Sequence, residues 1–489
     1  GIEAELTFST YVRSGKSTLR AAVVDREGNI YAVGGAGDAA WPTIGPTFQG
    51  GGLDAAIAKF DPSGRLLWSR LIGGPSEDYA YVAAVNDSGE VTIGGRAGEG
   101  IPTTAGAFER RFQGGVGEGP HDPADGLVAR FSPDGELVWA TYIGGEGEDN
   151  VRAIHLLPDG RVIVGSGNTT SRRLPIDRGR LPGPVLKPKA GGVKDSWVAL
   201  LAADGGSIEF LTYFGPSDDR NPRHDEIVRA LGTDAAGNIW IGGTTSGSDL
   251  VPTPDAFQKR RGSPRGTSES YIAKLSPDGR RLVYFSWLGG NGNDGIETEG
   301  VSDGRGAFYV AGSTSSTDFP TTEGAFQRTL LGKGDAFVAR IEPDGRLGMA
   351  TLYGGSTAGP ESFFGPVVDP SGNVWATGRM RSPDCAVTAN AFQPRKAGAQ
   401  DVVLVAFSPD GRSLLYGTYL GGGDADHGRH VAIRPDGGTV YAVGETNSRD
   451  FPVRNVQSDN RSTTFLFGFR VAPLAAAPPA AVAPPAESD

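Results

Sequence analysis

Asp234-Ala-Ala-Gly-Asn-Ile-Trp240 is the clearest copy of a short pattern that returns along the whole chain. Its glycine recurs seven times, at positions 28, 89, 160, 237, 306, 372 and 438, so the period is 61 to 77 residues. The other copies begin at Asp25, Asn86, Leu157, Asp303, Asp369 and Arg434. A long period built of short strands and tight turns is typical of propeller blades or solenoid units.

Each period contains four strand signals. In the third period they cover residues 151–157, 161–165, 196–201 and 209–215. β-Branched and aromatic residues dominate these segments, and Asp-Gly turns or Gly/Pro-rich loops separate them. Four antiparallel strands in one unit predict one propeller blade.

The two ends of the chain favour a closed ring over an open stack. Residues 5–11 have the sequence of a fourth strand without its first three, and residues 431–433, 439–443 and 465–471 have that of three strands without a fourth. A solenoid would need polar caps at both ends, and we find no such caps in the sequence. We therefore predict an all-β, seven-bladed propeller over residues 1–471, in which the N-terminal strand completes the last blade.

Composition adds limits to this prediction. The chain has 489 residues, 76 glycines, 34 prolines, one cysteine and a net charge of −11. The acidic balance argues against nucleic-acid binding, and the sequence has no apolar run long enough to span a membrane. The abrupt start at Gly1 is what a trimmed, exported protein would show. Residues 472–489 are rich in Pro and Ala, which predicts an extended tail or linker.

A fuller motif carries a family resemblance. The segment Gly312-Ser-Thr-Ser-Ser-Thr-Asp-Phe-Pro-Thr-Thr-Glu-Gly-Ala-Phe-Gln327 leads into Asp335-Ala-Phe-Val-Ala-Arg340, and weaker copies surround 243–258 and 445–452. This unit resembles the SBBP β-propeller repeat of exported bacterial proteins, and its strand order is similar to that of NHL repeats. The resemblance implies a secreted, periplasmic or cell-surface protein and brings no catalytic signature.

The blade order also predicts which face carries the long loops. With the strand before each Asp-x-x-Gly turn innermost, the Asp-Gly turns share one face and the long, irregular connections share the other. Function usually sits on long loops held by a rigid scaffold. We therefore place partner docking on the loop-rich face.

A set of acids follows the Gly-Gly pairs between blades, namely Asp78, Asp149, Asp225, Asp294 and Asp426, with Glu361 a looser match. They enter the innermost strands, so we expect them around the channel mouth. One interpretation is a cation site at Asp78, Asp149, Asp294 and Asp426, for which Ca²⁺ is the fitting hard ion. The other, which we favour, is that each Asp accepts hydrogen bonds from the amides of its own loop.

Two short segments contain histidine beside acids. His427 and His430 lie in the segment 424–430, where they either bind a transition metal or, as we favour, belong to a solvated loop. His224, beside Asp225 and Glu226, is either an acid/base group or part of an ion pair. No nucleophile elbow or phosphate loop accompanies them in the sequence.

Basic residues are distributed unevenly along the chain. Eleven cations occupy two successive intrablade loops of this acidic chain: Arg172, Arg173, Arg178, Arg180, Lys187, Lys189, Lys194, Lys259, Arg260, Arg261 and Arg265. Adjacent blades would place them side by side as a partner-binding sector for an anionic protein or polyanionic polysaccharide. Simple solvation of long loops is the alternative.

Two classes of function follow from the sequence. The first is a non-catalytic binding or scaffold propeller of an exported protein or complex. The second is a polysaccharide-active hydrolase or lyase with its site at the channel mouth. Because propellers host many chemistries, the fold alone does not decide between them.

Overall fold

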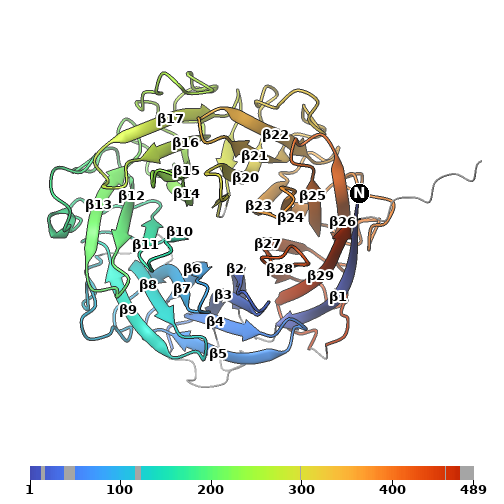
Figure 1. The fold of residues 1–489 in the computed structure, drawn as a ribbon, viewed down its shortest axis with the longest axis horizontal. Helices are drawn as coiled ribbons and strands as arrows, with labels where there is room; N and C mark the ends of the chain where they lie inside the picture. The colour runs from blue at the N-terminus through green and yellow to red at the C-terminus, as the bar shows by residue number, and fades with distance from the viewer. Residues whose placement is uncertain (13–16, 38–49, 116–122, 298, 457–458, 474–489) are drawn as a thin grey trace, which may run out of the picture.

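A ring of seven four-stranded sheets surrounds a central axis, as Figure 1 shows. The computed structural model describes residues 1–12, 17–37, 50–115, 123–297, 299–456 and 459–473. The predicted fold and the predicted number of blades are confirmed. The tail predicted over 472–489 lies almost wholly outside the described residues, and the last strand extends to Pro473.

Blades 1 to 3 follow each other along the chain. From the axis outward, blade 1 consists of β2 (Ser17–Val24), β3 (Ile30–Ala36), β4 (Asp54–Phe60) and β5 (Leu66–Ile72). Blade 2 consists of β6 (Tyr79–Val85), β7 (Val91–Ala97), β8 (Asp125–Phe131) and β9 (Leu137–Ile143). Blade 3 consists of β10 (Ala153–Leu156), β11 (Val162–Gly165), β12 (Ser196–Leu201) and β13 (Ile208–Phe214). A 3₁₀ turn, η1 (Ile176–Arg178), lies in the long loop of blade 3.

Blades 4 to 6 repeat the order, with one interruption. Blade 4 consists of β14 (Glu226–Thr233), β15 (Ile239–Thr245), β16 (Glu269–Leu275) and β17 (Leu282–Leu288). Blade 5 consists of β18 (Asp294–Ile296), β19 (Val301–Ser302), β20 (Phe308–Thr314), β21 (Asp335–Ile341) and β22 (Leu347–Tyr353). Blade 6 consists of β23 (Ser362–Val368), β24 (Val374–Met380), β25 (Asp401–Phe407) and β26 (Leu414–Leu420). In blade 5 the innermost strand is split into β18 and β19, and both pair with β20.

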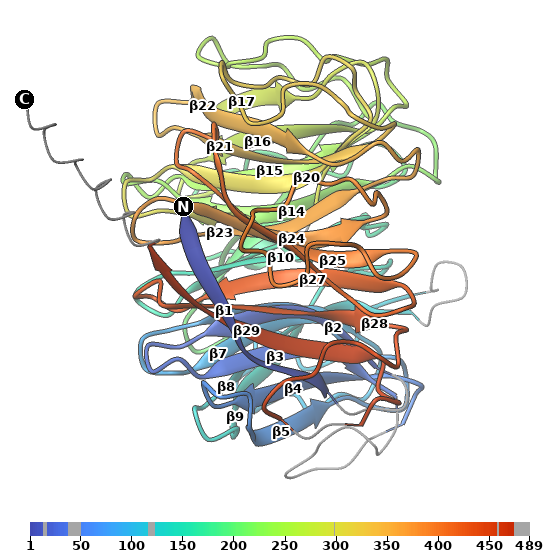
Figure 2. The ribbon, with the colours of Figure 1, turned by 90° about the vertical axis from the view of Figure 1, so that its right-hand side faces the viewer.

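Blade 7 joins the two ends of the chain. It consists of β27 (Asp426–Ile433), β28 (Thr439–Thr446), β29 (Thr464–Pro473) and, outermost, β1 (Ile2–Val12). β1 pairs antiparallel with β29 from Ile2–Pro473 to Val12–Thr464, and Figure 2 shows the two strands side by side at the edge of the ring. The predicted closure, three strands from the C-terminus and one from the N-terminus, is confirmed.

The repeated turn has a local physical cause. In blade 4 the Asp234 carboxylate accepts the backbone N–H groups of Ala236 and Asn238 at 3.0 and 2.9 Å. Gly237 sits at φ +82°, a left-handed conformation that favours glycine. The Asp-x-x-Gly pattern therefore encodes a tight turn between the first and second strands, as predicted.

Blades are joined on the turn side through a basic residue near the end of the third strand. Lys59 Nζ donates to the carbonyl of Pro133 at 2.9 Å, and Lys274 Nζ donates to that of Pro343 at 2.8 Å. Each acceptor lies in the turn between the third and fourth strands of the next blade. Arg130 and Arg340, which end Val-Ala-Arg copies of the repeat motif, donate to the carbonyls of Ala203 and Pro409 in the corresponding turns of the next blades.

The long intrablade loops cover the outer edges of the ring. In blade 2 the Tyr142 N–H donates to the Glu109 carbonyl at 3.0 Å, and in blade 3 the Tyr213 N–H donates to the Lys187 carbonyl at 3.0 Å. These loops therefore run along the outermost strand, where they occupy hydrogen-bonding groups that a bare sheet edge would expose. Within the described part of the chain, no helix is long and apolar enough to cross a membrane.

Candidate functional site

The acids predicted at the channel mouth lie buried at the blade junctions. Asp78, Asp149 and Asp426 each accept the backbone N–H of the second glycine of the preceding Gly-Gly pair, at 2.8 to 2.9 Å. Asp149 also accepts the hydroxyls of Thr169 and Ser171, at 2.5 and 2.6 Å. Each carboxylate thereby fastens the connection between two blades.

The structure corrects one member of this set and strengthens another. Glu226, not Asp225, occupies the equivalent place in blade 4, where it accepts the Thr245 hydroxyl at 2.7 Å. Asp225 is exposed and accepts the side-chain amide of Asn168 at 2.8 Å. Glu361 matches well, since it is buried and accepts the Ser382 hydroxyl. The predicted cation role stays a prediction, and the described residues contain no group of three or more His, Cys, Asp or Glu that could hold a metal.

Sequence reasoning missed a second acid at each of these junctions. A carbon added at Gly73 would lie 2.3 Å from Asp54 Oδ1 and 2.7 Å from Asp78 Oδ2, so two carboxylates face each other across this glycine. The pairs are Asp54–Asp78, Asp125–Asp149, Asp195–Glu226, Glu269–Asp294, Asp335–Glu361 and Asp401–Asp426. The first residue of the Asp-Ala-Phe-Val-Ala-Arg motif is this second acid, so the motif could have indicated the pair.

Burial dominates the protonation of these pairs. It raises the pKa of Asp78 to about 8, with the charge of Asp54 adding to the effect. It also raises the pKa of Asp125 to about 8, with the charge of Asp149 adding to the effect. The pKa values of Glu269 and Glu361 rise to about 7 for the same reason. Two buried carboxyl groups that face each other are stable when they share a proton.

Arginines form a second feature of the channel that sequence reasoning missed. β-Bulges in β2, β14 and β27 leave Arg20, Arg229 and Arg429 as the extra residues. Arg152 occupies the same place in blade 3, just before β10. A bulge re-aims the side chain of its extra residue, and all four side chains are half-buried. In the sequence, these arginines could have been found by their spacing, since Arg152 follows the junction acid Asp149 by three residues.

Aromatic rings and other charges surround these arginines. The Arg152 guanidinium lies 3.7 Å from the centroid of the Tyr81 ring, and Arg20 Nε donates to the Tyr79 hydroxyl at 3.3 Å. Burial, with the positive charges of Arg229, Arg20 and Arg96, lowers the pKa of Arg152 to about 10. These guanidinium groups therefore lie near enough to one another for their like charges to repel.

Glu299 crosses the axis on the turn side of the arginines. Its backbone N–H donates to the Arg229 carbonyl of blade 4 at 3.1 Å. Its carboxylate accepts the Ala83 N–H of blade 2 at 3.3 Å and lies 2.7 Å from His430 Nε2 of blade 7. Contacts to such distant blades place Glu299 within the channel. In Figure 1 the yellow chain before β20 reaches toward the centre of the ring.

The histidines differ from their predicted setting. His427 and His430 belong to β27 and are buried, so the favoured solvated-loop interpretation is wrong. The paired strands, rather than a bent loop, hold them. His224 Nδ1 lies 2.9 Å from Asp219 Oδ2, a contact that becomes an ion pair when the imidazole is protonated. It also borders a polar cavity of about 340 Å³ between blades 4 and 5, which Arg229 and Glu297 line as well.

Many of the eleven predicted partner-binding cations are held within the protein. Lys187 Nζ lies 2.8 Å from Asp195 Oδ2, and Arg261 donates to the carbonyls of Gly247 and Ser263. Further contacts engage Arg172 with Gly192, Arg173 with Glu146, Arg178 with Glu109, Arg180 with Ser207 and Arg265 with Asp218, and Lys194 also has a partner.

Lys189, Lys259 and Arg260 remain exposed, and their side chains have no ion pair or hydrogen bond to another described residue. The segments that carry them follow the outermost strands: the Arg180 N–H donates to Ile208, and the Trp287 N–H donates to Gln258. The basic residues therefore flank the outer side of the ring rather than the channel mouth.

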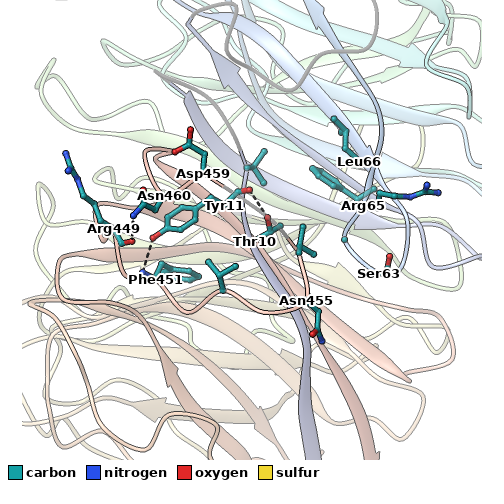
Figure 3. Close-up of a pocket in the computed structure, with 15 residues that line it drawn as sticks. Thr10, Tyr11, Ser63, Arg65, Leu66, Arg449, Phe451, Asn455, Asp459 and Asn460 are labelled. Carbon is teal, nitrogen blue, oxygen red and sulfur yellow. Dashed lines mark hydrogen bonds between the residues drawn. The ribbon is translucent and has the colours of Figure 1, made fainter.

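A large cavity lies at the closing junction of the ring. It measures about 1110 Å³ and is lined by residues of β1, of the turn between β4 and β5, and of the loop before β29. Figure 3 shows Tyr11 pointing toward Phe451, whose N–H donates to the Tyr11 hydroxyl at 2.9 Å. The same hydroxyl donates to the Ser448 carbonyl at 2.6 Å, so this tyrosine fastens β1 to the loop.

The chain is similar to several known proteins at low sequence identity. No protein-family model matches the chain, so the SBBP resemblance stays a prediction. The chain is 24% identical over 300 residues to the Regulatory protein FlaEY of Caulobacter vibrioides. That match covers 59% of this chain and 28% of the relative, so the chain spans well under a third of the relative's length.

Similar solved structures include other propellers. The WD40 repeats of RRP9 align with a TM-score of 0.49 and 12% identity, over 96% of this chain and 100% of that one. The Pan2 WD40 domain of Neurospora crassa aligns with a TM-score of 0.46 and 8% identity, over 95% of each chain. A chain of Kuenenia stuttgartiensis hydrazine synthase aligns with a TM-score of 0.40 and 10% identity, over 87% of this chain and 92% of that one.

Proposed function

We propose that this chain is a non-catalytic binding propeller of an exported or cell-surface protein, and that its partner is anionic where it touches the ring. The partner docks on the outer side of blades 3 and 4, over Lys189, Lys259 and Arg260. One observation carries the proposal: these cations are exposed and have no partner within the described residues, in a chain of net charge −11. Charges of this kind steer association more than they stabilise the fold.

Two further observations support a binding role. The blade-junction acids are buried and bonded to their own loops, which leaves them unsuited to act on a polymer at the channel mouth. The distant relative is described as a regulatory protein, which agrees with a role that needs no catalysis. The alternative hydrolase or lyase retains one supporting feature, the polar cavity beside His224.

Charge reversal tests the proposal directly. The variant Lys189→Glu, Lys259→Glu and Arg260→Glu changes exposed residues that have no ion pair within the described residues, so it should fold like the parent. Two probes represent the possible partners: polygalacturonate for an anionic polysaccharide and poly-glutamate for an acidic protein surface. We expect the parent to bind one of them at low salt and the variant to lose that binding.

A matched control reverses Arg328, Arg395 and Arg412, which are exposed on blades 5 and 6. This control variant should bind like the parent, with the same decline as salt rises. Binding that survives reversal on blades 3 and 4, or that falls equally in both variants, would contradict the proposed surface.

A further inference from the structure

A group of side chains between blades 6, 7 and 1 remains unexplained by the fold. We call it the arginine site: Arg20 of β2, Arg379 of β24, His427 and Arg429 of β27, and Glu445 of β28. Arg429 Nη2 lies 2.9 Å from Glu445 Oε2. Burial, with the positive charges of Arg429, Arg379 and Arg20, lowers the pKa of His427 to about 2, so this imidazole is neutral.

Three buried polar atoms of the arginine site have no hydrogen-bond partner among the described residues. They are Arg379 Nε, His427 Nε2 and Glu445 Oε1. His427 itself is only 9% exposed. A buried polar atom left unpaired costs about 1–3 kcal/mol, and unpaired atoms of this kind call for an explanation such as a ligand. Three of them in one place indicate a site whose hydrogen bonds are completed by a bound molecule.

The charges of the site define the chemistry of that molecule. Three arginines face one glutamate and a neutral histidine, which leaves two positive charges in excess. Arginine pairs well with planar carboxylates. Glu445 Oε1 can only accept, so the same ligand must also donate a hydrogen bond. Phe364 supplies an apolar wall, since its ring lies 4.9 Å from that of His427 in an edge-to-face arrangement.

The way into the site is set by Glu299. The innermost strands run from the loop-rich face toward the turn-rich face, and His430 and Ala83, which bind Glu299, come later in their strands than Arg429 and Tyr81. The Glu299 crossing therefore lies on the turn side of the arginine site. A ligand would enter from the loop-rich face.

We propose that the arginine site binds a small hydroxycarboxylate, the chemical class of sugar acids and hydroxy acids. Its carboxylate is held by Arg379 and Arg20, and its hydroxyl donates to Glu445 Oε1. The site is separate from the outer surface proposed for partner docking and does not depend on it. Reversal of the outer cations should leave binding at the arginine site unchanged.

Calorimetric titration of the full chain at low salt tests this proposal. The probes are D-glucuronate and lactate, with D-glucose as an uncharged comparison and inorganic phosphate as a tetrahedral oxyanion. We expect at least one of the two hydroxycarboxylates to bind at one site per chain. Loss of a charge-assisted hydrogen bond in Arg379→Gln or Arg20→Gln should weaken this binding about tenfold or more.

Two controls keep the outcome clear. Arg412→Gln, an exposed change on blade 6, should bind like the parent, and each variant must melt in the same cooperative transition. Absence of binding by both hydroxycarboxylates would overturn the proposal, as would equal binding by the parent and both site variants. Phosphate binding without carboxylate binding would overturn the assigned ligand class.

Discussion

Six blade junctions hold a pair of buried carboxyl groups, whereas the junction that closes the ring holds two hydroxyls. Ser17 and Thr464 stand there at the places that acids occupy elsewhere. Thr464 Oγ1 donates to the Val12 carbonyl at 2.7 Å, so it fastens β1 rather than a Gly-Gly connection. The repeat thus uses acid pairs at the six junctions where a glycine directly follows the outermost strand, and hydroxyls at the junction where β1 leads into blade 1.

The largest expected effect comes from breaking the closing junction. Deleting residues 1–12 removes β1, which buries Leu6, Phe8 and Tyr11 and pairs with β29 along its length. Burial of each such side chain is worth about 1.5–3 kcal/mol, so the loss approaches the whole stability of a typical domain. We expect aggregation and a broad, low-temperature melt, measured by size-exclusion chromatography and thermal unfolding. A monomeric variant with the parent's melting temperature would contradict the closure.

Replacing one acid of a junction pair should change the melting temperature less, and at high pH it should raise it. Asp125 Oδ1 faces Asp149 across Gly144 and has no hydrogen-bond partner among the described residues. In Asp125→Asn an amide N–H can replace the shared proton there. We expect the variant to melt above the parent at pH 9 and close to it at pH 5.

The control for that change is Asp204→Asn, an exposed acid in the same part of the ring. It should leave the melting temperature unchanged at both pH values. A destabilised Asp125→Asn at pH 9 would mean that the pair needs both negative charges.

The smallest predicted effect concerns the hydroxyls around a junction acid. Thr169→Val removes one donor to the buried Asp149 carboxylate while keeping the shape of the side chain. The same hydroxyl accepts the Ser171 N–H at 3.2 Å, so two hydrogen bonds of buried groups are lost, each worth about 1–3 kcal/mol. Urea unfolding should show this as a lower midpoint with an unchanged slope, and Thr103→Val on the same face serves as a half-exposed comparison. An unchanged midpoint for Thr169→Val would mean that this hydroxyl does not stabilise the junction.

The architecture could be predicted because its signals are local. A glycine at positive φ and an acid that caps its own turn leave the same mark in every blade, as at Asp234 and Gly237. The split blade was visible because residues 5–11 have no first three strands before them. Local turn chemistry, repeated seven times, was sufficient to predict the seven-bladed ring.

The channel could not be predicted in the same way because its contacts join distant parts of the chain. Glu299 binds Ala83 and His430, which lie more than a hundred residues away on either side. The path of the basic loops along the outer strands depends on backbone bonds such as Tyr213 to Lys187. Charge in the sequence marked these loops, yet it could not show that Lys187 and Arg261 serve the fold.

The most direct test of the account is thermal unfolding of the full chain between pH 5 and 9, with chelator and with added Ca²⁺. The pKa values of Asp294 and Asp426 rise to about 6, and those of Asp78 and Asp125 to about 8, mainly through burial. Acids whose pKa is raised by folding stabilise the native state below their unfolded pKa, and that stabilisation is lost as pH rises through the folded pKa.

We therefore predict a melting temperature that is highest near pH 5 and falls through pH 6 to 8, by on the order of 5 °C, with no response to chelator or to Ca²⁺. A melting temperature that rises with pH, drops with chelator and recovers with Ca²⁺ would contradict the shared-proton account. It would instead identify the junction carboxylates as cation ligands.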